Sequence, residues 1–519
     1  MSHSISTLPL ATAALLWAAI APAAEITLTP RDLFQAAEGL FLAPGVEVPA
    51  PDLDRPAIRH AVSGPAADRV RALIADGEAA GFAGLVYDNR DHSHSQLPSA
   101  LYPRLARLAY APALQSRGLD YGLAGHILLP AIVFGNSSTA ITRSSAPRSL
   151  PRLAMTAPGW PERTHRTYVS NHIYVYPEHR DHDAVDHFPA QWPYMIVSQG
   201  SSGSDKPFLH ALAMTLAAFR PDTRDALEEA GLVAPALQMI LRRSLDGVET
   251  RDDYLSGRAH PTVFDAGRLR PLRMIEMAAS LAPDALPPLV RLTVEAEDFG
   301  PAAGLAARDE RLYDTPSAIA RLWRGHAGRR EMVLSARTMP APRGREVNFR
   351  WVLLQGDPAR VRITPEGPTG ERARIEMDWQ PALTQTDPDG QTRRRTRIDI
   401  GVFAETGETL SAPAIVSVSF PAHQLRRYEP GPDGTPRLAE VDYDAARRGA
   451  PFDPLLYWSA PWRDVFVYAP DGTLAGWTRW GKNGREAYGA DGRRLGQVTM
   501  RYEIERREDD LPVLRAVPD

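Results

Sequence analysis

Reactive side chains crowd into one part of this 519-residue chain, residues 168–208. The run contains His172, Glu178, His179, Asp181, His182, Asp183, Asp186 and His187. Imidazole and carboxylate groups are the side chains that ligate divalent metals and transfer protons near neutral pH. We therefore predict that the functional site lies within residues 172–205.

One interpretation of this cluster is a divalent metal site. The predicted ligands are His179, His182, Asp186 and His187, with His92 and His94 as further ligands from another loop. Two histidines separated by one residue point the same way when they lie on a strand. Only part of the His-x-His-x-Asp-His motif of metallo-β-lactamase-fold hydrolases is present, because Ala184 stands at the middle histidine, and that family is excluded. The alternative is a polar loop whose histidines, carboxylates and arginines pair with one another.

A metal-free acid–base site is the other functional interpretation. Glu178 with Asp181 or Asp183 would act as the acid and base of glycoside hydrolysis, with His179 and His182 as proton carriers. Three aromatic residues of the same run, Tyr174, Tyr176 and Trp192, would stack on sugar rings. The competing interpretation of these aromatic residues is that they fill a core.

Two loops of small polar residues are candidates to flank one pocket. The first contains Gly200, Ser201, Ser202, Gly203 and Lys206 and precedes a helix, whose amides and dipole suit an anion or oxyanion. Ser202 is the candidate nucleophile or clamp there, although the segment misses the Gly-x-Ser-x-Gly pattern by one position. Helix capping by Ser204 or Asp205 explains the same residues. The second loop spans residues 135–139.

The composition and the first residues predict an exported protein. Residues 8–20 are mostly apolar and Ala21-Pro22-Ala23 offers a cleavage site, which predicts a signal peptide over 1–23, with a signal anchor as the alternative. Cysteine is absent, which excludes disulfides and thiolate metal sites. A net charge of −4 predicts no nucleic-acid partner. No other stretch is long and apolar enough to cross a bilayer.

The predicted fold class is α+β with several domains. An α-rich domain with short strands is expected over 24–295, then a linker with a short helix over 296–329. Alternating segments separated by turn signals predict an all-β sandwich over 330–425. A small β segment of hairpins is expected over 440–510, where two Asp-Gly turns stand twenty residues apart.

A family resemblance accompanies the β pattern of residues 330–425. Residues 348–352 (Asn-Phe-Arg-Trp-Val), then Gly-Asp-Pro at 356–358 and Ala-Arg-Ile-Glu-Met at 373–377, resemble polycystic-kidney-disease-type and related immunoglobulin-like domains of secreted bacterial proteins. The resemblance implies that Trp351 packs the core of a sandwich, and that this part is a spacer or glycan-contacting accessory without catalytic residues. Residues 24–295 resemble no characterised family.

Together these observations predict a periplasmic or secreted bacterial hydrolase that acts on an extracellular glycan or related polymer through its His/Asp/Glu cluster. The alternative is a non-enzymatic carbohydrate-binding or cell-envelope protein.

Overall fold

The computed structural model describes residues 23–92, 94–122, 125–141, 148–300, 309–340, 345–407, 409–432, 434–443, 460–482, 484–496, 500–506 and 512–518. Residues 1–22 of the predicted signal peptide lie outside the described residues. No helix in the described part of the chain has the length and apolar character needed to cross a membrane.

The N-terminal region is built on a parallel sheet of six strands. In sheet order these are β1 (Glu25–Leu28), β5 (Ala106–Tyr110), β4 (Leu85–Asn89), β7 (Ile132–Asn136), β10 (His172–Pro177) and β11 (Ile196–Ser198). All neighbouring pairs are parallel. Smaller sheets join β2 (Phe34–Ala37), β3 (Leu40–Leu42) and β6 (His126–Leu128), and β8 (Ala140–Ile141) with β9 (Arg148–Ser149).

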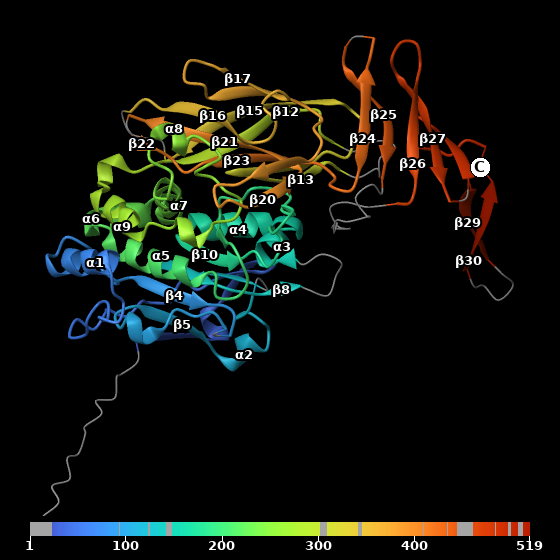
Figure 1. Ribbon diagram of the computed structural model, residues 1–519. Coiled ribbons are helices and arrows are strands. Elements are labelled where there is room, and N and C mark those ends of the chain that lie inside the picture. Colours follow the sequence, from blue (N-terminus) through green and yellow to red (C-terminus); the bar gives the residue numbers. More distant parts are fainter. Residues whose placement is uncertain are drawn as a thin grey trace, which may run out of the picture.

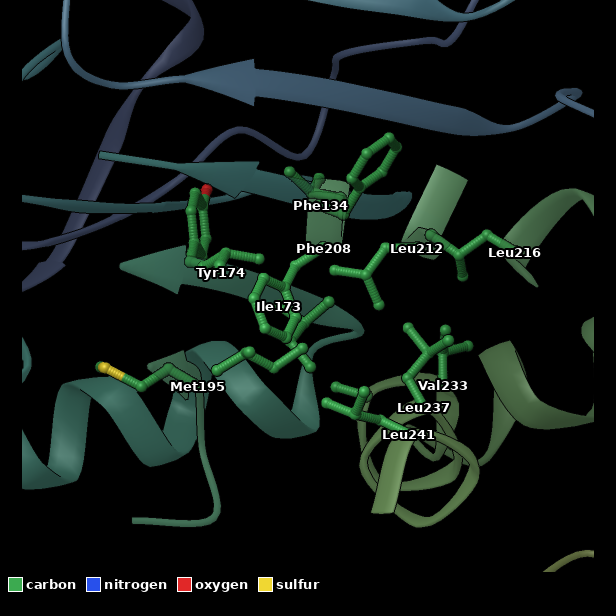
Figure 2. Close-up of a cluster of buried hydrophobic side chains, with 14 of the residues drawn as sticks. Phe134, Ile173, Tyr174, Met195, Phe208, Leu212, Leu216, Val233, Leu237 and Leu241 are labelled. Carbon is green, nitrogen blue, oxygen red and sulfur yellow. The ribbon is translucent and has the colours of Figure 1, made fainter. Parts of the chain in front are cut away.

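Parallel strands need long crossover connections, and helices supply several of them. The helices are α1 (Pro65–Ala75), α2 (Pro112–Gln115), α3 (Leu150–Thr156), α4 (Trp160–Val169), α5 (Lys206–Ala218), α6 (Pro221–Glu229), α7 (Val233–Arg243), α8 (Arg251–Tyr254) and α9 (Pro271–Ser280). Helix α5 contacts β7, and α3, α4 and α7 contact β10. Figure 2 shows Phe208 and Leu212 of α5 and Leu237 of α7 gathered with Phe134 and Ile173 of the sheet.

The β region contains two sheets over one core. The first comprises β12 (Leu289–Glu297), β15 (Arg329–Met339), β18 (Arg372–Asp378) and β17 (Val361–Glu366). The second comprises β13 (Arg311–Thr315), β14 (Ala318–Leu322), β23 (Ala414–Ser419), β21 (Arg397–Thr406) and β16 (Asn348–Gln355), with β22 (Thr409–Leu410) beside β21. Apolar residues of both sheets, among them Trp351, Ile375 and Ile400, form one buried cluster.

Three further β elements complete the fold. The hairpin of β19 (Leu383–Thr386) and β20 (Thr392–Arg395) packs against the N-terminal region through a bridge between Arg394 and Val185. A five-stranded sheet contains β24 (Leu425–Pro430), β25 (Pro436–Asp442), β26 (Arg463–Tyr468), β27 (Leu474–Gly481) and β28 (Gly484–Gly489). It extends from the β region toward the C-terminal hairpin of β29 (Met500–Arg506) and β30 (Pro512–Pro518) (Figure 1).

The predicted fold class is wrong. The N-terminal region is an α/β domain around six parallel strands, not an α-rich domain with a few short strands. The rest consists of several distinct sheets, and one of them mixes a parallel pair, β14 with β23, into antiparallel strands. Strands β13 and β14 occupy the part in which a linker with a short helix was expected. The family resemblance of 330–425 stays a prediction.

Candidate active site

The candidate site lies at the point in the parallel sheet where the order of the strands reverses. The chain passes from β4 to β5 on one side and then returns to β7 on the other side of β4. The carboxyl ends of the strands at such a switch point are where open α/β sheets bind ligands. Asn89 ends β4 and Asn136 ends β7, so two amide side chains stand at this point.

Ser95 holds two carboxylates together at this edge. Its backbone N–H donates to Asp91 Oδ2 at 2.9 Å, and its hydroxyl donates to Asp205. Asp205 is the N-cap residue of α5, but its side chain makes no capping bond. Asn136 Nδ2 donates to Asp205 Oδ2 at 2.5 Å instead. The carboxylate of Asp205 is therefore committed to the sheet edge rather than to its own helix.

Hydroxyl and amide groups complete the surroundings of these carboxylates. Ser138 Oγ donates to Asp91 Oδ2 at 2.9 Å and lies 3.1 Å from Nδ1 of His94. The Tyr87 hydroxyl donates to Asn136 Oδ1 at 2.7 Å, which fixes the orientation of that amide. We call Asp91, Ser95, Asn136, Ser138, His179 and Asp205 the edge cluster.

His179 brings an imidazole to the edge cluster from the carboxyl end of β10. Burial lowers the pKa of His179, while a hydrogen bond with the Ser138 backbone and the nearby charge of Asp205 act in the opposite direction. Because the bond with Ser138 favours the charged imidazolium, a ring N–H of His179 donates to the Ser138 carbonyl oxygen. The other ring nitrogen, Nε2, is buried and has no hydrogen-bond partner within the described residues.

A second polar atom of the edge cluster is also buried without a partner. Asp91 is 3% exposed, and its Oδ1 accepts no hydrogen bond from the described residues. Buried polar atoms are almost always hydrogen-bonded in folded proteins, because an unsatisfied one costs about 1–3 kcal/mol. Asp91 Oδ1 and His179 Nε2 are therefore the atoms with which this site would meet a substrate or a water molecule.

The backbone around the site is strained. Left-handed φ angles occur at His92 (56°), after β4, and at His179 (49°) and Arg180 (75°), after β10. Non-glycine residues rarely adopt this conformation, and it is concentrated at functional sites. Among the described residues, only Asn171 adds another such non-glycine position.

Glu178 lies next to His179 and stabilises the loop that presents it. Its Oε2 accepts from the His182 N–H at 2.9 Å and its Oε1 from the Gly200 N–H at 3.2 Å. Burial raises the pKa of Glu178 to about 7, although the backbone N–H groups of Arg180, His182 and Gly200 act in the opposite direction. The predicted acid–base carboxylate is therefore bound to the backbone of two site loops.

This pKa predicts a pH dependence of stability. The folded-state value of about 7 lies above the value of about 4.3 for an unfolded Glu. Between those values the folded chain binds more protons, so stability should fall as the pH rises from about 4.3 to about 7. Glu178→Gln should flatten this decline, whereas Glu229→Gln, at an exposed position of α6, should leave it unchanged. Denaturant unfolding measured across that range checks this; an unchanged slope in Glu178→Gln would contradict it.

The structure places the other predicted His and Asp residues elsewhere. His182 and Asp186 are 2% and 4% exposed and face the β region. Asp186 pairs with Arg397 at 3.0 Å, and the His182 carbonyl accepts from Arg393 at 2.7 Å. This is the paired polar loop that the sequence offered as the alternative to a metal site.

The remaining predicted ligands do not converge on one point. Asp183 is exposed beside Arg180. His92 lies 3.1 Å from Asp120, with its side chain 63% exposed, and His187 donates its backbone N–H to the Asp181 carbonyl. No group of three or more His, Asp or Glu residues within the described ranges is arranged to hold a metal ion.

The predicted aromatic residues are core residues. Tyr174 is 6% exposed and donates its hydroxyl to Asp88, and Tyr176 is 2% exposed and stacks on Tyr174. Trp192 is 3% exposed and packs edge-to-face on Tyr194 and Tyr313. None of these three rings presents a face on which a sugar could stack.

The small-residue loop after β11 contributes few side chains to the candidate site. Ser201, Ser202 and Lys206 are exposed, and Gly203 is half-buried with φ of 95°. Gly200 contributes its N–H to Glu178. The two small polar loops do come together, since Asn136 of one donates to Asp205 at the end of the other.

Sequence reasoning did not identify Asp91 and Ser95 as site residues. It considered Asn136 and Ser138 only as part of the loop 135–139 beside a pocket, and Asp205 only as a helix cap. A usable signal was present. Each polar run, 88–95 and 136–139, directly follows a short apolar segment that forms a parallel strand. Carboxyl ends of parallel strands share one edge of a sheet, so the two runs had to meet.

Comparisons with known proteins add little to this geometry. No family model and no curated protein matches the chain. A search of solved structures found a nucleoside hydrolase-related hypothetical protein from Saccharophagus degradans that is associated with carbohydrate metabolism. It is 10% identical, with 56% of this chain and 71% of that chain covered and a TM-score of 0.19. At that TM-score the likeness carries no argument about this chain, and the description of that protein is not transferred to it.

Proposed function

We propose that this protein is a hydrolase that cleaves a glycosidic bond of an extracellular glycan or related polymer at the edge cluster. One observation carries the proposal. Two carboxylates, Asp91 and Asp205, are both bound by Ser95 beside His179, and Asp91 Oδ1 and His179 Nε2 have no partner among the described residues. Groups that accept protons and have no protein partner are what hydrolysis by water requires.

His179 is the proposed general base. Burial keeps its pKa below the ordinary value, so the ring is neutral and can accept a proton at neutral pH. The nearby charge of Asp205 stabilises the imidazolium that forms. In the proposed step water gives one proton to Nε2, and its oxygen forms a bond to the anomeric carbon as the glycosidic C–O bond breaks. The departing oxygen takes up a proton from the solvent and the imidazolium then releases its proton to the solvent, which balances the reaction.

Asp91 is proposed to position the substrate or the water. Its free Oδ1 can accept one hydrogen bond, while Oδ2 is held by Ser95 and Ser138. Burial raises the pKa of Asp205, and the charge of Asp91 acts in the same direction, although the bonds from Ser95 and Asn136 oppose this. Hydroxyl and amide groups surround both carboxylates, which suits a ligand rich in hydroxyl groups.

A periplasmic or secreted location is part of the proposal and is supported by the apolar segment and cleavage site of residues 8–23. The rival function is non-catalytic carbohydrate binding. Turnover separates the two, because a binding protein would retain its ligand without releasing new reducing ends.

Ser95→Ala tests the proposed site. The variant removes the hydroxyl that bonds Asp205 and should lower hydrolysis of aryl glycosides and polysaccharides at least about tenfold, as loss of a bond to a charged group predicts. Ser99→Ala should have the hydrolysis rate of the wild type. Ser99 lies four residues after Ser95, at the start of a single 3-10 turn. Reducing-end release and thermal melting are measured for all three proteins. If Ser95→Ala retained the full activity of the wild type, the reaction would have to take place outside the edge cluster.

A further inference from the structure

A cavity of about 660 Å³ lies between the N-terminal region and the β region, apart from the edge cluster. One wall comes from the segment 246–268, and the other from the end of β16 and the β19–β20 hairpin. The size falls within the range of about 300–1,000 Å³ that is usual for small-molecule sites. The hairpin strand β20 reaches the N-terminal region through the bridge between Arg394 and Val185.

Charges on the cavity walls balance. The lining contains the arginines Arg258, Arg268, Arg393 and Arg395 and the aspartates Asp246, Asp265, Asp387 and Asp389. Each wall contributes two residues of each sign. Burial lowers the pKa of His260, which also lines the cavity, well below its ordinary value, so this ring adds no charge at neutral pH. A charged ligand of either sign would meet as many like charges as opposite ones.

The polar lining is built into the fold rather than left in solvent. Arg393 is 2% exposed and pairs with Asp387 at 2.7 Å and Asp389 at 2.8 Å. Arg395 is 8% exposed and bonds Gln355 and Asp387, yet its Nε is buried with no partner within the described residues. An unsatisfied guanidinium N–H in the wall of a cavity indicates a donor that is free for a ligand.

We infer that this cavity binds a neutral polyhydroxylated ligand, a sugar unit, independently of the edge cluster. A hydroxyl group donates to carboxylates and accepts from guanidinium groups, so a ligand rich in hydroxyl groups can bind both halves of this lining. Neutral sugars also avoid the cost of placing a net charge among four charges of the same sign.

Binding here is separable from the proposed catalysis. The nearest link is Arg393, whose Nη2 donates to Gln199 Oε1 at 3.3 Å, while Gln199 Nε2 donates to Glu178 Oε1 at 3.3 Å. Neither Asp91 nor His179 lines the cavity. A failure of the proposed reaction would therefore leave sugar binding intact.

Calorimetric titration tests the inference on the full chain, both wild type and His179→Asn. The probes are three neutral trisaccharides (maltotriose, cellotriose and xylotriose), trigalacturonic acid and the chitosan trimer. At least one neutral trimer should bind at millimolar concentration or below, equally well in both proteins. Gln385→Trp, which fills the rim of the cavity, should weaken binding about tenfold or more.

Two further variants sharpen the result. Thr384→Trp is the matched control, because Thr384 lies next to Gln385 in β19 and does not line the cavity. Asp389→Asn keeps the turn bond to the Gln391 N–H but removes one negative charge, and should shift preference toward the acidic trimer. Absence of neutral-trimer binding, a charged trimer preferred by the wild type, or binding unaffected by Gln385→Trp would each overturn the inference.

Discussion

Replacing His179 by Asn should lower turnover about 10²–10⁴-fold, the usual contribution of a general base, while the protein stays folded. The change removes the buried Nε2 that has no hydrogen-bond partner within the described residues. Asparagine is chosen because it tolerates the left-handed backbone, with φ of 49°, better than most residues. Initial rates and thermal melting of the full chain measure the two effects separately.

Two histidine variants serve as controls for this prediction. His92→Asn has the same left-handed backbone, with φ of 56°, but its ring lies beside Asp120 and Tyr121, so near-normal rates are expected. His182→Ala should lose stability instead, because that ring is 2% exposed at the interface with the β region. A His179→Asn enzyme with wild-type turnover would remove His179 from the mechanism.

The pH profile gives an independent check on the role of His179. Because burial lowers its pKa, the base stays unprotonated to a lower pH than an ordinary histidine. The acid limb of kcat/KM should therefore lie below about 6.5, the pKa of a free histidine side chain. An acid limb above that value would assign the base to another group.

Arg397→Met should destabilise the protein by about 3–5 kcal/mol, the cost of breaking a buried ion pair by removing one partner. Arg397 is 3% exposed, with its Nη2 3.0 Å from Asp186 and its Nε 2.8 Å from Asp399. It also donates to the Phe188 carbonyl at 2.6 Å. The variant leaves two carboxylates buried without this cation. Denaturant unfolding at neutral pH measures the loss.

An exposed ion pair supplies the matched control. Arg220→Met removes a pair with Asp222 at 2.7 Å in which the two side chains are 47% and 49% exposed, and should cost only about 0.2–1 kcal/mol. Equal losses in both variants would show that Arg397 does not hold the interface together.

At acid pH, the free energies of unfolding of the wild type and of Arg397→Met should differ less than at neutral pH. Burial alone would raise the pKa of Asp186, but Arg397 and His182 hold it well below the ordinary value. That contribution to wild-type stability is complete above about pH 4, the pKa of an unfolded Asp, and is lost as the pH falls toward the lowered pKa. Arg397→Met lacks the stabilisation from the Asp186–Arg397 pair at neutral pH already, so it has none to lose in acid.

The polar run within residues 168–208 serves two purposes, one at the candidate site and one at the contact with the β region. Glu178 and His179 turn toward the sheet edge, whereas His182 and Asp186 turn toward the β region. Residue type and spacing identify such a segment as polar and reactive. They do not say which side chains face which neighbour, because that depends on Arg393 and Arg397, more than 200 positions further along the chain.

Helices were easier to predict than strands in the N-terminal region. The loop of residues 200–206 and its capping residues predicted the helix that follows them, which is α5. Strands such as β7 and β10 are buried on both faces, with no exposed residue, so they lack the alternation that marks a half-buried strand. Short apolar runs of this kind do not separate a core helix from a strand, and the parallel sheet was missed.

The sequence by itself determined the β character of the C-terminal half and identified the polar segment that contains His179 of the edge cluster. Tertiary structure decided the rest of the site. Asp91, Asn136, His179 and Asp205 are separated by tens of residues and meet only because parallel strands bring their carboxyl ends to one edge of the sheet. Asp205 shows this most directly. It has the sequence signature of a helix cap, but Ser95 and Asn136 bind its carboxylate instead.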